Sequence, residues 1–146
     1  GEYIITGSIN GDTPLKIVND TNAPASYSIT LDNAAIVGSA WCTAFVINSP
    51  DAPVVVNLKS TGNCEITTSQ NHQPIKAETP NVTINYELIN GSLYLRGPYT
   101  GAEGVYNEYI TFNSSCGIVN AADQSVRLEH TIENGTCAIC CAPVTE

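Results

Sequence analysis

The sequence predicts a parallel β-solenoid with three faces, about 28 residues per coil and four to five coils. Three observations indicate it. Alternation of apolar and polar residues at period two dominates the chain, β-branched residues are dense, and short apolar segments recur at a nearly fixed separation. A chain that returns to the same wall after every coil stacks equivalent side chains in columns, about 4.8 Å apart.

Three sets of segments give the three walls. Leu15, Phe45 and Ile75 are each 30 residues apart. Ile29, Val56, Ile84 and Ile110 are separated by 27, 28 and 26 residues, and Ile36, Ile66 and Leu95 by 30 and 29. The inward column of the second wall is expected to contain Ile29/Leu31, Val56/Leu58, Ile84/Tyr86 and Ile110/Phe112.

Residues 80–97 could form an isolated hairpin, but the repeat favours two successive walls with a corner at Asn90-Gly91. Residues 120–134 contain a helix-like pattern and also alternate at period two, and are interpreted as a strand. The alternative fold is an antiparallel sandwich of the immunoglobulin sort, which also has strands every 8 to 12 residues. Trp41 precedes Cys42, which is the wrong order for that fold.

Length and composition favour a single domain over residues 1–146. The net charge is −9, and the five scattered cations are too few to neutralise phosphates, which argues against nucleic acid and anionic membrane surfaces. No apolar stretch approaches the roughly 20 residues of a membrane-spanning helix. Because the chain starts at Gly1, we expect a mature extracellular protein whose signal peptide has been removed.

Six cysteines occur in this chain, which we expect to be extracellular, and structural disulfides are their expected state, in any of 15 pairings. They are Cys42, Cys64, Cys116, Cys137, Cys140 and Cys141. The C-x-x-C at residues 137–140 is a spacing found in zinc sites, but a zinc ion would need two more ligands. Cys116, His72 and His130 show no second paired spacing, so no metal site is predicted.

Five N-x-S/T sequons predict a glycoprotein, because their number is about twice what chance would give in so Asn-, Ser- and Thr-rich a chain. The acceptors would be Asn19, Asn81, Asn90, Asn113 and Asn134.

Segments such as "GEYIITGSINGDTPLKIV", "ITLDNAAI", "APVVVNLKSTGNCEIT" and "NVTINYELINGSLYLRG" resemble the bacterial "carbohydrate-binding domain-containing" β-helix proteins, distantly similar to pectate lyases. The resemblance covers roughly residues 1–97. It implies a right-handed parallel β-helix that is extracellular, non-catalytic and binds cellulose or acidic polysaccharide, with calcium (Ca2+) held by carboxylates in some members. The region corresponding to their acidic corners offers only Asp123, Glu129 and Glu133.

No catalytic residues are predicted, and the chain is not expected to be an enzyme. No nucleophile elbow, phosphate loop or zinc-protease motif is present, and no basic residue faces an acid pair. Tyrosines crowd one third of the chain, and aromatic faces stack on sugars. Tyr94 should point outward between Leu93 and Leu95. The predicted carbohydrate- or partner-binding surface is Tyr86, Tyr94, Arg96 and Tyr99.

The two terminal coils of such a stack expose unpaired backbone groups, and no amphipathic capping helix is visible in the sequence. Copies of the chain could cover these ends by stacking head to tail, which yields a filament. We therefore expect a secreted, disulfide-stabilised structural glycoprotein that self-assembles into an extracellular filament or coat. The alternative is a non-catalytic module that binds cell-wall or matrix polysaccharide.

Overall fold

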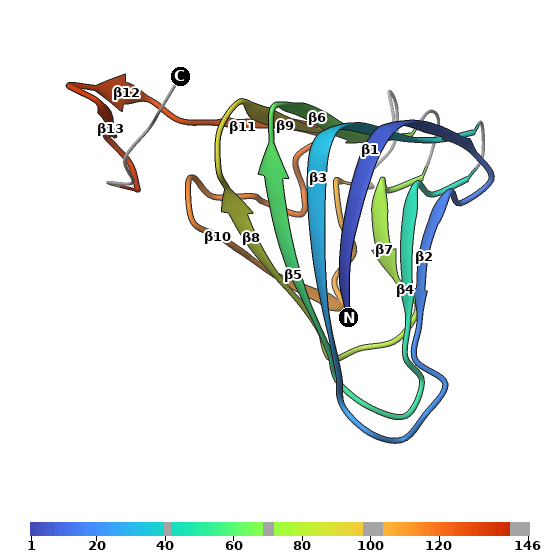
Figure 1. The fold of residues 1–146 in the computed structure, drawn as a ribbon. Helices are drawn as coiled ribbons and strands as arrows, with labels where there is room; N and C mark the ends of the chain where they lie inside the picture. Colours follow the sequence, from blue (N-terminus) through green and yellow to red (C-terminus); the bar gives the residue numbers. More distant parts are fainter. Residues whose placement is uncertain (40–41, 69–71, 98–103, 141–146) are drawn as a thin grey trace.

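The computed structural model describes residues 1–39, 42–68, 72–97 and 104–140. The chain is an all-β solenoid of about four turns, as predicted (Figure 1). Its described residues contain no helix, and hence none that is long and apolar enough to cross a membrane.

The shortest wall is a three-stranded parallel sheet of β2 (Leu15–Val18), β4 (Phe45–Asn48) and β7 (Ile75–Ala77). Leu15 lies opposite Phe45, and Phe45 opposite Ile75, so the predicted register is confirmed. Phe45, Ile47, Ile75 and Ala77 are fully buried, whereas Lys16 and Lys76, at outward positions of β2 and β7, are exposed. Alternation at period two therefore sets the face that each residue occupies.

The other two walls share one bent sheet. β1 (Glu2–Gly11) and β3 (Ala25–Gly38) run along both walls, and β1 pairs with β3 in parallel. In the following coils the two walls are separate strands: β5 (Val54–Thr61) and β8 (Val82–Leu88) on one, β6 (Asn63–Thr67) and β9 (Ser92–Arg96) on the other. β10 (Ile110–Ser114) follows β8. β8 and β9 each pair with the coil before and not with each other, so residues 80–97 are two walls rather than a hairpin.

The register is confirmed in the β3–β6–β9 wall, where Ile36, Ile66 and Leu95 lie side by side. In the β3–β5–β8–β10 wall two of the three expected pairings are wrong by two residues. Ile29 lies beside Leu58 rather than Val56, and Ile110 beside Val82 rather than Ile84. A shift of two keeps every side chain on its own face, so the apolar pattern cannot distinguish these registers.

The last part of the chain departs from the parallel solenoid. β11 (Ser125–Glu129) confirms a strand within residues 120–134, but it pairs with β9 in the antiparallel direction. β12 (Ile132–Glu133) and β13 (Thr136–Cys137) then form a small antiparallel hairpin. Asn134 and Gly135, both with positive φ, make its two-residue turn. The hairpin extends beyond the end of the stack (Figure 1).

The two ends of the core differ. At the C-terminal end it is closed by residues of the last coil, so the expectation that both ends are bare is wrong there. Val105, Val119 and Leu128 belong to the continuous core, and the rings of Tyr106 and Phe112 stack with centroids 5.4 Å apart. At the N-terminal end, β1 has no described neighbour on its outer edge, and most of its residues are exposed.

Candidate functional site

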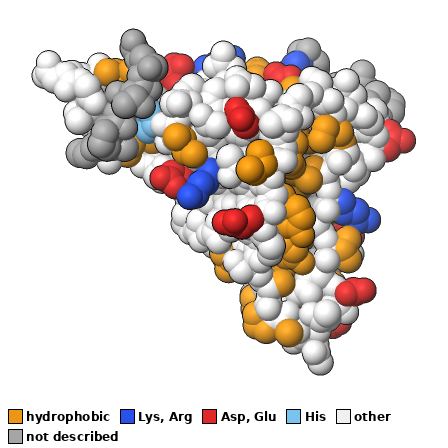
Figure 2. Space-filling model, in the orientation of Figure 1, with side chains coloured by type: hydrophobic (Ala, Val, Ile, Leu, Met, Phe, Trp, Pro, Cys, Tyr) orange, Lys and Arg blue, Asp and Glu red, His pale blue; other side chains and the backbone are white. Residues whose placement is uncertain are grey.

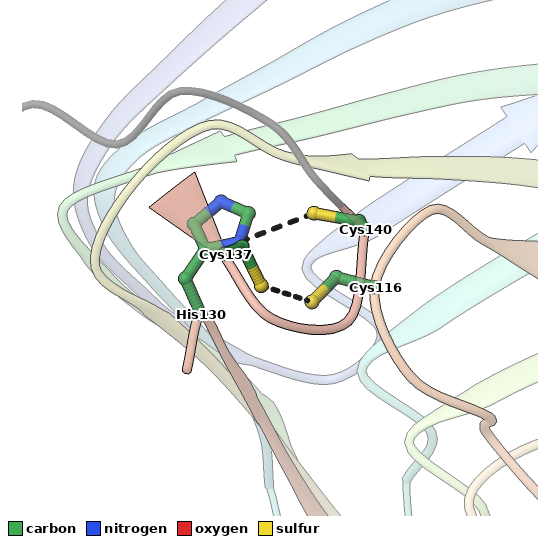
Figure 3. Close-up of side chains that lie close together, drawn as sticks. All are labelled: Cys116, His130, Cys137 and Cys140. Atoms are coloured by element: carbon green, nitrogen blue, oxygen red, sulfur yellow. Dashed lines mark hydrogen bonds between the residues drawn. The ribbon is translucent and has the colours of Figure 1, made fainter. Parts of the chain in front are cut away.

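Two features of the described residues stand out as candidate sites: a cysteine and histidine cluster beside the hairpin, and the open N-terminal end. The cluster comprises Cys116, His130, Cys137 and Cys140. Their potential ligand atoms all lie within 4.8 Å of one another, and this is the only such group of His, Cys, Asp and Glu in the described parts of the chain. The side chains converge from separate segments (Figure 3).

The fold brings the four residues together from three places. Cys116 follows β10, His130 follows β11, and Cys137 and Cys140 belong to the hairpin and the turn after it. The two cysteines of the C-x-x-C lie on one tight turn, whereas Cys116 and His130 meet them only because β11 reverses direction. Sequence spacing therefore showed the C-x-x-C half of the cluster, whereas Cys116 and His130 have no paired spacing in the sequence and are brought to it by the fold.

The donor atoms lie in two close pairs. Cys116 Sγ is 3.5 Å from Cys137 Sγ, and Cys140 Sγ is 3.5 Å from His130 Nδ1 (Figure 3). Cys116 and Cys137 are buried, while His130 and Cys140 are half-buried.

Hydrogen bonds fix the orientation of the histidine ring. His130 Nε2 lies 2.9 Å from the carbonyl oxygen of Leu88 and 3.2 Å from that of Ile89. Because carbonyl oxygens only accept, Nε2 carries the proton in a neutral ring. The lone pair of Nδ1 is then directed to the cysteines.

The electrostatics differ between the buried thiols. Backbone amides, first that of Cys140 and then that of Ile139, lower the pKa of Cys137 to about 5. The Ile139 amide donates to Cys137 Sγ at 3.5 Å. Burial raises the pKa of Cys116 to about 12, with a further contribution from its contact with Cys137. The backbone amides of the turn thus favour the thiolate at Cys137, whereas burial favours the thiol at Cys116.

The other cysteines lie elsewhere. Cys64 is buried in the core, and its thiol donates to the carbonyls of Thr61 and Leu31. Cys42 is half-buried beside Asp12. All five described cysteines are free thiols, so no disulfide joins any of them here, and Cys141 lies outside the described residues. The disulfide framework stays a prediction.

The open end is a hollow of about 590 Å³ lined by β1, β2 and β3. Ile5, Leu15, Ile17, Tyr27 and Ile29 supply its apolar wall. In Figure 2 hydrophobic side chains form a band between the positions of β1 and β2 in Figure 1. The N-terminal coil thus leaves part of the core surface uncovered.

The predicted carbohydrate surface does not form as expected. Tyr86 is buried, with 2% exposed, and its hydroxyl bonds Ser60 Oγ, so it cannot stack on a sugar. Tyr94 points away from the fully buried Leu93 and Leu95, and the Arg127 guanidinium lies 4.7 Å from its ring centre. Arg96 is half-buried, and Tyr99 lies outside the described residues.

The asparagines of the five sequons differ in their exposure. Asn19 is buried, and its amide donates to the carbonyl of Ala23 and to Ser49 Oγ, so it is not an accessible acceptor in the folded chain. Asn90 is half-buried at a corner and accepts from Thr61 and from the Gly62 amide. Asn81, Asn113 and Asn134 are exposed, so glycosylation stays a prediction at these positions. The acidic residues Asp123, Glu129 and Glu133 form no metal-binding group within the described chain.

The chain matches no protein-family model, no curated protein and no solved structure at a significant level. The resemblance to carbohydrate-binding β-helix proteins therefore stays a prediction.

Proposed function

We propose that this chain is a non-enzymatic structural subunit that assembles head to tail through the two ends of its solenoid. One observation carries the proposal: in the described residues, the exposed large hydrophobic side chains belong to the first coil or to the last coil with the corner and hairpin beside it. Those of the first coil are Tyr3, Ile4 and Val18. Those of the last coil, the adjoining corner and the hairpin are Ile89, Tyr109, Ile118, Ile132 and Ile139.

The outward surface of the middle coils is polar. β4, β5, β6 and β7 have no exposed large hydrophobic residue, and the outward positions of β5 and β8 are mostly polar. Asn57, Asn85 and Asn113 form a hydrogen-bonded ladder across this wall. The exposed apolar groups thus belong to the first and last parts of the solenoid and not to its middle coils, which favours contacts at the two ends.

The strands provide a matching edge at each end. β1 and β10 are the outermost strands of the same wall, and both run parallel to the strands between them. When one copy follows another along the axis, β10 of the first can pair with β1 of the second in the direction used throughout the wall. Such a contact is heterologous and does not close, so it propagates into a filament.

A second copy of the chain also has a side chain suited to the N-terminal hollow. Ile118 is 91% exposed on the loop after β10, at the end opposite to the open one. The N-terminal hollow offers Ile5, Leu15 and Ile17 as apolar partners. We infer that Ile118 of one copy inserts near these residues in the next copy, because each isoleucine side chain buried there contributes roughly 1.5–3 kcal/mol.

The test is the assembly state as a function of concentration, measured by light scattering after size exclusion and by negative-stain imaging. The wild-type chain is expected to form rods that lengthen with concentration. Ile118→Asp and Tyr3→Asp, the latter at an exposed residue that lines the hollow, should each weaken association by at least about tenfold, which corresponds to about 1.4 kcal/mol. Asn85→Asp adds the same charge to the exposed side of β8 and should leave assembly unchanged.

A wild-type chain that stays monomeric at every concentration would overturn the proposal, as would equal assembly of both end variants and the side variant. Retention of such a monomer by a polysaccharide resin would favour the carbohydrate-binding alternative, to which Tyr94 and Arg127 still offer an outward pair. Extracellular location and glycosylation stay separate predictions.

A further inference from the structure

The cysteine and histidine cluster beside the hairpin has no part in the assembly just proposed. It is nevertheless the most concentrated chemistry in the described chain, with three thiols and one imidazole directed at a common point (Figure 3).

The distances fit a small tetrahedral ion. Bonds of about 2.3 Å to sulfur and about 2.0 Å to nitrogen place two sulfurs about 3.8 Å apart, and a sulfur about 3.5 Å from a nitrogen. The observed pairs, Cys116 Sγ to Cys137 Sγ and Cys140 Sγ to His130 Nδ1, are both 3.5 Å apart. Four side chains can therefore reach one ion with small adjustments.

The surroundings of the ligands fit as well. Ligating histidines commonly donate their second ring N–H to a carbonyl, and His130 Nε2 has Leu88 and Ile89 carbonyls at 2.9 and 3.2 Å. The Ile139 amide points at Cys137 Sγ, which supports a thiolate rather than a thiol.

A disulfide explains less of this arrangement. A bond between Cys116 and Cys137 would use two of the thiols and leave Cys140 and the oriented His130 without a role. Soft thiolates with one imidazole select zinc among the common divalent ions, and the closed set of four protein ligands is that of a structural rather than a catalytic site.

The hairpin has little else to hold it. Among residues 131–140 only Cys137 is buried, and Ile132 and Ile139 are largely exposed. A two-stranded hairpin of this size is marginal in water without a further constraint. A bound ion would connect it to β10 through Cys116 and to β11 through His130.

We propose that Cys116, His130 through Nδ1, Cys137 and Cys140 bind one structural zinc ion that fixes the C-terminal hairpin to the end of the solenoid. Binding displaces the thiol protons to solvent, so that three thiolates and a neutral imidazole surround the ion. Under this proposal these three cysteines are zinc ligands rather than members of the predicted disulfide framework.

The experiment is cobalt and zinc titration of the full chain, purified under reducing conditions and stripped of metal. Co2+ should produce the intense visible bands of a tetrahedral thiolate site, saturating at one ion per chain, and Zn2+ should abolish them. Cys116→Ser and His130→Ala should each remove most of the cobalt absorbance. Cys64→Ser, which alters a thiol of the core, should keep it.

Two further measurements keep the outcome interpretable. Far-ultraviolet circular dichroism reports whether each variant retains the β-solenoid. His130→Cys provides a fourth thiolate in place of the imidazole, so it should keep the cobalt absorbance that His130→Ala loses. Absence of the cobalt bands in the folded wild-type chain overturns the proposal. So does a thiol count showing that Cys116 and Cys137 form a disulfide under these reducing conditions.

Discussion

The inward direction of the Tyr86 side chain places its ring and its hydroxyl in the core. It lies in the inward column of the second wall, between Leu58 and Ser114 of the neighbouring coils. Its ring packs 6.2 Å from that of Phe112, and its hydroxyl bonds Ser60 Oγ inside the core. A buried hydroxyl with a single partner is expensive to disturb, because that partner is then left without a hydrogen bond.

Replacing either member of this pair should therefore destabilise the chain. Tyr86→Phe and Ser60→Ala should each lower the free energy of unfolding by about 1–3 kcal/mol, measured by urea denaturation. The double variant should cost less than the sum of the two single changes, since it leaves no orphaned hydroxyl. Additive costs would show that the two hydroxyls do not interact.

The same residue gives a pH dependence. Burial raises the pKa of Tyr86 above its usual value, with the Ser60 hydrogen bond acting in the opposite direction. The neutral phenol is thus favoured in the folded state, and its contribution is full below about pH 10 and is lost as pH rises further. The stability difference between wild type and Tyr86→Phe should shrink above about pH 10, and a constant difference would contradict this assignment.

At the scale of the element, the corners depend on glycines stacked in successive coils. Gly62 and Gly91 both have φ of +74°, and a Cβ on Gly91 would collide with the backbone of Gly62. Asn90 Oδ1 accepts from the Gly62 amide at 2.8 Å and holds the two corners together. The walls can stack only if these corners stay this narrow.

Gly91→Ala should therefore destabilise the solenoid by more than the roughly 1 kcal/mol that left-handed backbone alone costs. Gly7→Ala is the matched control, because Gly7 has φ of +77° but no atom within 4 Å of the added Cβ. Thermal unfolding should show the larger loss for Gly91→Ala. Equal losses would mean that close approach at the corner is unimportant.

The hairpin should behave as a separate element if its zinc site is as proposed. Amides of residues 131–140 should exchange rapidly with deuterated solvent in metal-free protein and become protected when zinc is added. Amides in β3, β5 and β8 lie in the continuous core and should be protected in both states. Hydrogen exchange with mass spectrometry separates the two regions, and equal protection of the hairpin in both states would contradict the prediction.

At the scale of the whole molecule, charge opposes the assembly that the apolar ends favour. The chain carries a net charge of −9, so neighbouring copies in a filament repel one another. The screening length falls from about 10 Å at 0.1 M salt to about 3 Å at 1 M. Raising the salt concentration should therefore lengthen the rods seen by light scattering, and shortening would indicate that assembly depends on ion pairs instead.

The sequence by itself determined the solenoid, because its apolar residues recur at the coil length and their alternation assigns each to a face. It identified all three walls, the corner at Asn90-Gly91 and the strand within residues 120–134. Only the tertiary structure decided the register of Ile29 and Ile110, since a shift of two residues preserves the pattern. It also decided the closing of the C-terminal end and the meeting of Cys116 and His130 with the C-x-x-C turn. The meeting of these cysteines with His130 depends on the reversal of β11, and the direction in which a strand pairs leaves no trace in its own alternation.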